Sequence, residues 1–163
     1  MVFHLRPFRA FALLLLAVLL AGCGGPDRAE YQADLVRAGD VITTALDEMP
    51  QTDRATLGPD DVDSIADDVR EAADEIADLD PPDDAAKPQR RLVRGLRGVA
   101  AAFEDLATDL RKVQTDEQKA ELFVKFATDP DVTTAFEDVS ASQAAYVEAG
   151  YRVFGKAAPR PAK

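Results

Sequence analysis

Residues 92–113 read LVRGLRGVAAAFEDLATDLRKV, and this stretch decides the fold class. Its large apolar side chains recur at steps of three or four residues. They are Leu92, Leu96, Val99, Phe103, Leu106, Leu110 and Val113. This spacing places them on one face of an α-helix, while the residues between them are mostly small or charged. The stretch therefore predicts a long amphipathic helix whose apolar face lies in a protein core.

Three further segments repeat this spacing. The first segment carries Tyr31, Leu35, Ala38, Ile42, Ala45 and Met49. The second carries Val62, Ile65, Val69, Ala72, Ile76 and Leu79. The last carries Val132, Phe136 or Ala135, Val139, Gln143, Tyr146, Gly150 and Val153. A shorter apolar pattern in residues 117–127 predicts a short helix that covers one end of the core. No segment shows the strict alternation of a strand. We therefore predict an all-α protein, an antiparallel up-down four-helix bundle with a short extra helix before the last long helix.

Proline and glycine mark the expected ends of these helices. The breaks are, in chain order, Pro50, Gly58-Pro59, Pro81-Pro82, Thr128-Asp129-Pro130 and Gly155. Either Asp60 or Asp61 is expected to cap the second helix, because a carboxylate accepts hydrogen bonds from the free amides of a first turn. The third helix is expected to start at Pro88, or near Asp83 with a bend, since proline is tolerated only in the first turn.

Charge is unevenly distributed along the middle of the chain. Residues 60–84 contain twelve carboxylates and one arginine, and five cations without an intervening acid follow them. The cations are Lys87, Arg90, Arg91, Arg94 and Arg97. In an antiparallel hairpin the two segments lie side by side, so we expect ion pairs between them; the alternative is a patch that binds an anion or a partner. Gly95 and Gly98 lower helix stability, and we expect them at a close crossing of two helices.

The N-terminal residues have the pattern of a signal peptide. Residues 11–20 (FALLLLAVLL) form a continuous apolar run after Arg6 and Arg9, too short for a membrane-spanning helix of about 20 residues. The run ends in Leu20-Ala21-Gly22-Cys23, which resembles the lipobox of bacterial lipoproteins. The resemblance implies that a diacylglycerol is attached to the sulfur of Cys23 and that cleavage makes Cys23 the first residue. It also implies that membrane lipid holds the protein on the outer, extracytoplasmic face of the cell membrane.

These signals divide the chain into four parts. They are a signal peptide at 1–22, a lipidated tether at 23–27, a helical bundle at 28–155 and a flexible basic tail at 156–163. Aspartate outnumbers glutamate and arginine outnumbers lysine, a bias typical of a GC-rich genome such as an actinobacterial one.

Composition narrows the classes of function. The one histidine, His4, lies in the expected signal peptide, and Cys23 is the one cysteine. The processed chain therefore lacks the groups for Ser-His-Asp or Cys-His catalysis and for zinc or haem sites built on imidazole or thiolate. We expect a non-enzymatic protein without a metal or other cofactor. Its 30 acidic and 19 basic residues also disfavour nucleic acid as a partner.

Two binding functions remain open on the sequence alone. In the first, the bundle contacts another protein of the cell envelope or has a structural role there. In the second, it holds a small apolar or cationic ligand in a cavity between the helices. The aromatic side chains that follow the expected signal peptide are predicted to lie in the core, with the lining of such a cavity as the alternative. They are Tyr31, Tyr146, Tyr151, Phe103, Phe123, Phe126, Phe136 and Phe154.

Overall fold

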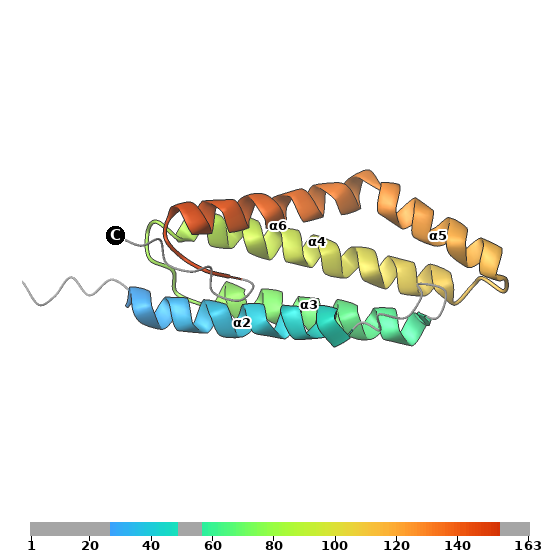
Figure 1. Ribbon diagram of the computed structural model, residues 1–163, viewed down its shortest axis with the longest axis horizontal. Coiled ribbons are helices and arrows are strands. Elements are labelled where there is room, and N and C mark those ends of the chain that lie inside the picture. The colour runs from blue at the N-terminus through green and yellow to red at the C-terminus, as the bar shows by residue number, and fades with distance from the viewer. Residues whose placement is uncertain (1–26, 49–56, 154–163) are drawn as a thin grey trace, which may run out of the picture.

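The computed structural model describes residues 27–48 and 57–153, and all regular secondary structure within these two ranges is helical (Figure 1). The helices are α2 (Arg28–Glu48), α3 (Pro59–Asp78), α4 (Ala86–Leu110), α5 (Asp116–Thr128) and α6 (Pro130–Glu148). The all-α prediction is confirmed, and α5 is the short helix expected at 117–127. Within the described ranges, none of these helices has the length and apolar character needed to cross a bilayer. Met49, Pro50, Phe154, Gly155 and the tail lie outside the described residues, as does the side chain of Ala45.

Consecutive helices run in opposite directions from α2 to α4, and the chain then returns along α4 through α5 and α6 (Figure 1). The returning arm breaks at Asp129, because Pro130 lacks the amide that would continue a helix from α5. The Asp129 carboxylate accepts hydrogen bonds from the amides of Asp131 at 2.8 Å and Val132 at 3.4 Å. The predicted Thr128-Asp129-Pro130 boundary is therefore present, with Asp129 as the cap of α6.

The starts of α3 and α4 differ from the sequence predictions. Gly58, rather than Asp60 or Asp61, occupies the N-cap position of α3. Asp61 still contributes, because its carboxylate accepts a hydrogen bond of 2.8 Å from the Gly58 amide. Helix α4 begins at Ala86, so Pro88 lies inside its first turn, where no intrahelical amide bond is lost. Neither expected start of the third helix was therefore correct.

The core forms from the apolar faces that the spacing predicts. The predicted residues that are buried are Tyr31, Leu35, Ala38, Ile42, Val62, Ile65, Val69, Ala72, Ile76, Leu92, Leu96, Val99, Leu106, Leu110, Val132, Tyr146 and Val153. Of the two alternatives on α6, Ala135 is buried and Phe136 is 46% exposed. Leu122, Phe123 and Phe126 of α5 are half-buried against the far end of the core, as expected for a helix that covers it.

The two glycines of α4 lie at a close crossing with α6, which confirms their predicted role. A methyl group on Gly95 would lie 2.9 Å from both the Ala135 carbonyl oxygen and the Val139 amide nitrogen. A methyl group on Gly98 would lie 2.9 Å from the Cβ of Ala135. Only glycine lets the two helix backbones approach this closely. The crossing fixes the position of α6 on α4.

The last helix ends earlier than predicted. Helix α6 stops at Glu148, and Gly150 adopts a left-handed backbone conformation with φ of 84° that turns the chain back. Tyr151 and Val153 are buried, but they reach the core from this returning segment, whereas Val153 was expected on the apolar face of the helix. The expectation that the helix continues to Gly155 was therefore wrong.

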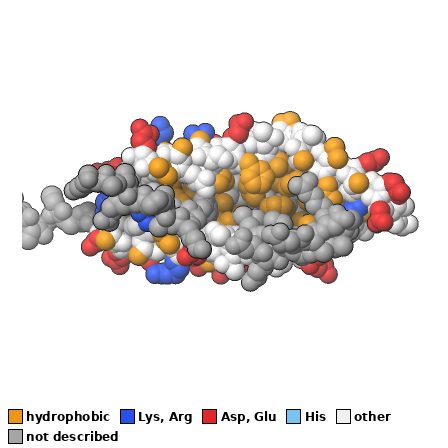
Figure 2. All heavy atoms as spheres, in the orientation of Figure 1, with side chains coloured by type: hydrophobic (Ala, Val, Ile, Leu, Met, Phe, Trp, Pro, Cys, Tyr) orange, Lys and Arg blue, Asp and Glu red, His pale blue; other side chains and the backbone are white. Residues whose placement is uncertain are grey.

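Helices α2 and α6 do not pack directly against each other in the described part of the chain. Side chains span the space between them at one end, which we call the tyrosine pole after Tyr31, Tyr146 and Tyr151. The Tyr151 ring meets the other two edge to face, with centroids 5.6 Å from Tyr31 and 5.9 Å from Tyr146. In Figure 2, apolar side chains gather near the middle of the face that is seen, between the two ends of the molecule. The opposite end, where residues 111–115 connect α4 to α5, is called the far pole.

Candidate functional site

The predicted lipid-attachment residue and the rest of the lipobox, Leu20, Ala21, Gly22 and Cys23, lie outside the described residues. Lipidation therefore stays a prediction. The described chain starts at Asp27, four residues after Cys23, and α2 follows at once. A lipid on Cys23 would therefore be tied to the tyrosine pole.

The five cations of α4 separate into groups with different partners. Arg97 binds Asp74 of α3 at 2.8 Å, which agrees with the predicted pairing of α3 and α4. Arg91 and Arg94 instead bind Asp138 of α6 through their Nε atoms, at 2.9 and 2.7 Å. Within the described ranges, Lys87 and Arg90 are exposed and form no ion pair. Arg70 of α3 also binds Glu104 of α4, and Arg111, the C-cap residue of α4, binds Asp60 and Asp63 of α3.

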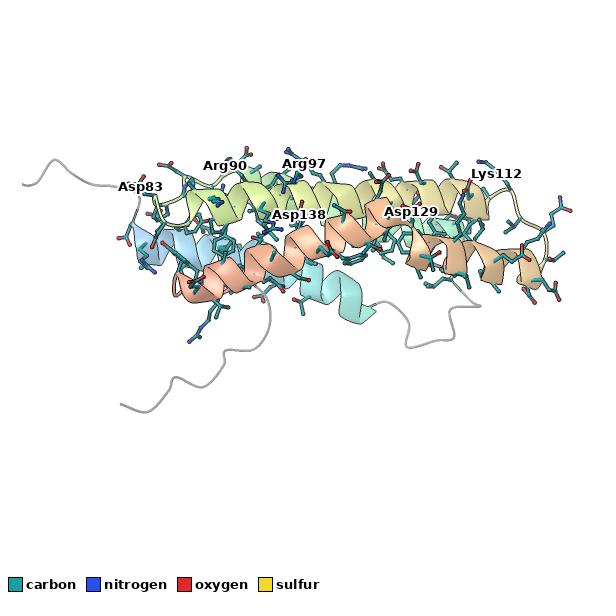
Figure 3. The ribbon with its side chains drawn as sticks, turned by 90° about the horizontal axis from the view of Figure 1, so that it is seen from above. Asp83, Arg90, Arg97, Lys112, Asp129 and Asp138 are labelled. Carbon is teal, nitrogen blue, oxygen red and sulfur yellow. The ribbon has the colours of Figure 1, made fainter. Side chains whose placement is uncertain are left out.

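Asp138 is the residue of this region that the sequence pattern missed. It is only 9% exposed, and the two arginine hydrogen bonds occupy one oxygen each. The bonds from Arg94 and then Arg91 lower the pKa of this carboxyl to about 2. In Figure 3, Asp138 projects from α6 beside α4, on which Arg90 and Arg97 are labelled. The carboxylate therefore serves as an ionic clamp between α4 and α6, next to the glycine crossing.

A buried hydrogen-bonded network fills the tyrosine pole. The Tyr31 hydroxyl donates to the Gln89 side-chain oxygen at 3.0 Å, so the Tyr146 hydroxyl, 2.7 Å away, donates to Tyr31. The Gln89 amide donates in turn to the Ile76 and Leu79 carbonyl oxygens at the end of α3. Burial raises the pKa of Tyr31 to about 12 and raises the pKa of Tyr146 further. Both hydroxyls therefore stay neutral, as hydrogen-bonding groups that join α2, α3, α4 and α6.

The solvent-facing edge of this network is charged. The Tyr151 hydroxyl donates to Asp84 at 2.8 Å, and Arg28 binds the other oxygen of Asp84 at 2.8 Å. The Arg28 guanidinium also lies 4.3 Å from the centroid of the Tyr151 ring and donates to the Ala149 carbonyl oxygen. The Tyr151 hydrogen bond, followed by the charge of Arg28, lowers the pKa of Asp84. Among the described residues, every buried side-chain nitrogen and oxygen has a partner, so the network acts as a structural joint.

The described surface carries a groove between α4, α5 and α6, which we call the distal groove. Its volume is about 330 Å³, and it is open to solvent. Small and apolar side chains form its floor and walls: Gly98, Ala101, Ala102, Leu106, Leu122, Phe126 and Val132. Asp105, Asp109, Asp129 and Asp131 lie around it with one cation, Lys125. The groove exists because α5 turns away from α6 at Asp129, labelled in Figure 3, just beyond the glycine crossing.

A second hollow, of about 370 Å³, lies at the tyrosine pole between α2 and α3. Five carboxylates line it together with Tyr31 and Leu79: Asp27, Glu30, Asp34, Asp78 and Asp80. Within the described ranges, no group of three or more acidic, histidine or cysteine side chains is placed to hold a metal ion. Carboxylates thus line both hollows, the one at the tyrosine pole and the distal groove.

Comparisons with known proteins give no relationship to build on, since no family model, curated protein or solved structure matches this chain.

Proposed function

We propose that this chain is a lipid-anchored extracytoplasmic protein that works by binding and not by catalysis. In this proposal its domain is an antiparallel four-helix bundle in which α5 and α6 share the fourth position. Three features support a binding role. They are the ionic clamp at Asp138, the buried tyrosine network, and a solvent-open groove with an apolar floor. The first two hold the helices in fixed positions, and the third offers a surface on which a partner can rest.

The observation that carries the location is the sequence Leu20-Ala21-Gly22-Cys23 at the end of the apolar run 11–20. Small residues before the cysteine suit cleavage by a signal peptidase, and the thiol is the nucleophile that accepts the lipid. Two or three acyl chains bind a bilayer far more firmly than one, at about 0.8 kcal/mol per buried methylene group. The tether would then place the tyrosine pole next to the membrane and the distal groove away from it.

Metabolic labelling tests the location. Cells that express the full chain are grown with an alkyne-bearing fatty acid, and the purified protein is examined for the label. We expect label on the wild-type chain and none on Cys23→Ser. A wild-type chain without label that retains residues 1–22 would disprove the anchor.

Crosslinking on intact cells tests the binding role. We expect a defined crosslinked species between the anchored chain and another envelope protein, the partner class that the proposal names. A turnover of small-molecule substrate by the purified chain, without such a species, would contradict the proposal.

The distal groove also favours a second candidate, the binding of a small ligand. Its volume of about 330 Å³ falls within the range of ligand sites, and Phe126 with four carboxylates would suit a cation with an apolar part. In this case the purified chain would keep such a compound through purification, and mass spectrometry of the native protein would detect it.

A further inference from the structure

The distal groove combines an apolar floor with unbalanced charge. Asp109 is already paired with Lys112 at 2.8 Å and lies 4.0 Å from Lys125, which lowers the pKa of its carboxyl. Asp129 is committed to the cap of α6. Asp105 and Asp131, on opposite walls, are exposed and form no ion pair within the described ranges. Two carboxylates therefore face solvent across an apolar floor without a compensating cation.

The α5 wall of the groove is loosely held. None of the residues of α5 is fully buried, although Leu122, Phe123 and Phe126 all point toward α4. Phe126 stacks on Phe103 of α4 at 5.3 Å between centroids, and Leu122 and Phe123 pack on the same apolar cluster. Val124, on the same helix but outside the lining of the groove, is 64% exposed. Such a helix leaves apolar surface that a partner can cover at little cost to existing contacts.

The α4 wall sets the size of the occupant. Groove residues on α4 run from Gly98 to Asp109, a length of roughly 16 Å or three helical turns. Because Gly98, Ala101 and Ala102 are small residues, the surface of α4 along this stretch stays free of protruding side chains. An elongated, shallow groove of this kind fits the apolar face of one helix better than a compact molecule.

From these observations we propose that the distal groove docks a basic amphipathic helix of a partner protein. Its apolar side chains would cover the floor between Ala101 and Phe126, and lysine or arginine side chains beside them would pair with Asp105 and Asp131. This inference rests on the proposed binding function, but it does not depend on the lipid at Cys23.

A peptide titration tests the inference. The probe is a helical peptide of about 14 residues, roughly four turns, made of leucines at steps of three and four with lysines between them. The full chain is kept in a non-ionic detergent, so the measurement works whether or not Cys23 carries lipid. Backbone amide NMR signals of the protein are followed, because they do not respond to peptide dissolved in the detergent. We expect saturable shifts in α4, α5 and α6, and much weaker binding of a peptide with the same residues in scrambled order.

Matched variants separate the groove from general attraction to an acidic protein. The double variant Asp105→Asn/Asp131→Asn should weaken binding about five- to tenfold, as expected for the loss of two ion pairs. The control Glu71→Gln/Glu75→Gln removes the same charge from exposed positions of α3 and should change binding less than about twofold. Ala101→Trp fills the groove from an exposed helical position without changing charge, and should weaken binding about tenfold.

Several results would overturn the proposal. They are equal weakening by the two charge variants, normal binding to Ala101→Trp, equal binding of the scrambled peptide, and no binding at all. Concentration-dependent shifts of the same signals before peptide is added would assign the groove to a second copy of the chain. Binding that tightens about tenfold when residues 156–163 are deleted would assign it to the basic tail. Each of these results leaves the labelling test of Cys23 untouched, so failure of the groove and failure of the anchor are distinguishable.

Discussion

Exchanging one methyl group between α4 and α6 tests whether the glycine crossing holds the bundle together. Gly98→Ala would place a new Cβ 2.9 Å from the Cβ of Ala135, closer than two methyl groups normally approach. The helix gains about 1 kcal/mol from the better propensity of alanine, and overpacking costs about 2 kcal/mol. We therefore expect Gly98→Ala to lower the free energy of unfolding by about 1 kcal/mol, instead of raising it as in an exposed helix.

The reverse change on α6 should restore the fit. Ala135→Gly alone loses about 1 kcal/mol of helix propensity and about 0.8 kcal/mol for one buried methyl group, together about 2 kcal/mol. In Gly98→Ala/Ala135→Gly the close contact is gone, so the double variant should be destabilised by only about 1 kcal/mol. The single effects add to about 3 kcal/mol, and the expected coupling between the sites is therefore about 2 kcal/mol. Urea unfolding followed by circular dichroism measures the free energy of unfolding of the wild-type chain, the two single variants and the double variant, which together form a double-mutant cycle.

Gly95 supplies the control, because a methyl group there meets backbone atoms as well as the Val139 side chain, and none of these contacts involves the Ala135 methyl group. The Ala135 carbonyl oxygen and the Val139 amide nitrogen, both at 2.9 Å, remain in place when Ala135 becomes glycine. We expect Gly95→Ala to be more destabilising than Gly98→Ala, by up to about 2 kcal/mol net, and to show no rescue by Ala135→Gly. If Gly95→Ala or Gly98→Ala raises stability as in an ordinary helix, or if the two cycles give the same coupling, the packing argument is refuted.

Because the pKa of Asp138 is lowered to about 2, below the ordinary value of about 3.9, its pairing stabilises the fold above about pH 4, and that stability is lost as the pH falls toward 2. Thermal unfolding from pH 6 to pH 2 should therefore be less steeply pH-dependent in Asp138→Asn, and identical slopes would contradict the clamp. Tyr31→Phe leaves both the Gln89 oxygen and the Tyr146 hydroxyl without a partner and should lower the free energy of unfolding by about 2 kcal/mol. Tyr146→Phe leaves the bond between Tyr31 and Gln89 in place and should lower it by about 1 kcal/mol. Calorimetry that reverses this order would refute the donor assignment. Gly150→Ala places a Cβ at φ of 84° and should cost about 1 kcal/mol, with Gly150→Asn milder, and an unchanged melting temperature would show that the turn is not required.

Apolar spacing was enough to predict the helices and most of the core, but it left the rotation of α6 open. Ala135 and Phe136 fit the pattern equally well, and the choice depends on the glycines of α4, which admit a methyl group and exclude a phenyl ring. Asp138 and Ser142 are buried on the same face, yet neither side chain is apolar. Ser142 is satisfied by the Pro88 carbonyl oxygen at 2.7 Å, and Asp138 by two arginines. These partners lie on another helix, so no local pattern reveals them.

The end of α6 and the distal groove were missed for different reasons. Gly150 follows the apolar pattern of α6 and is a typical residue for ending a helix, but Val153 continued the spacing and suggested a longer one. The left-handed turn at Gly150 is what brings Tyr151 and Val153 back to the core on a non-helical segment. The groove depends on the angle between α5 and α6, which the Asp129-Pro130 signal locates but does not specify. Of the five cations, Arg97 has the predicted kind of partner on α3, whereas Arg91 and Arg94 pair with Asp138 of α6.

The returning segment also brings the two described ends of the chain together. Gln32 of α2 exchanges two hydrogen bonds with the backbone of Arg152, at 2.8 and 2.9 Å, although 120 positions separate them in sequence. A short linker could join these ends, with new termini opened in residues 111–115 between α4 and α5. Such a circular permutant would retain the same helix contacts while moving the chain termini to the opposite end. If a permuted chain were attached to a surface through these new termini, the tyrosine pole would point away from that surface. Asp105 and Asp131 would then lie at the end nearer to it.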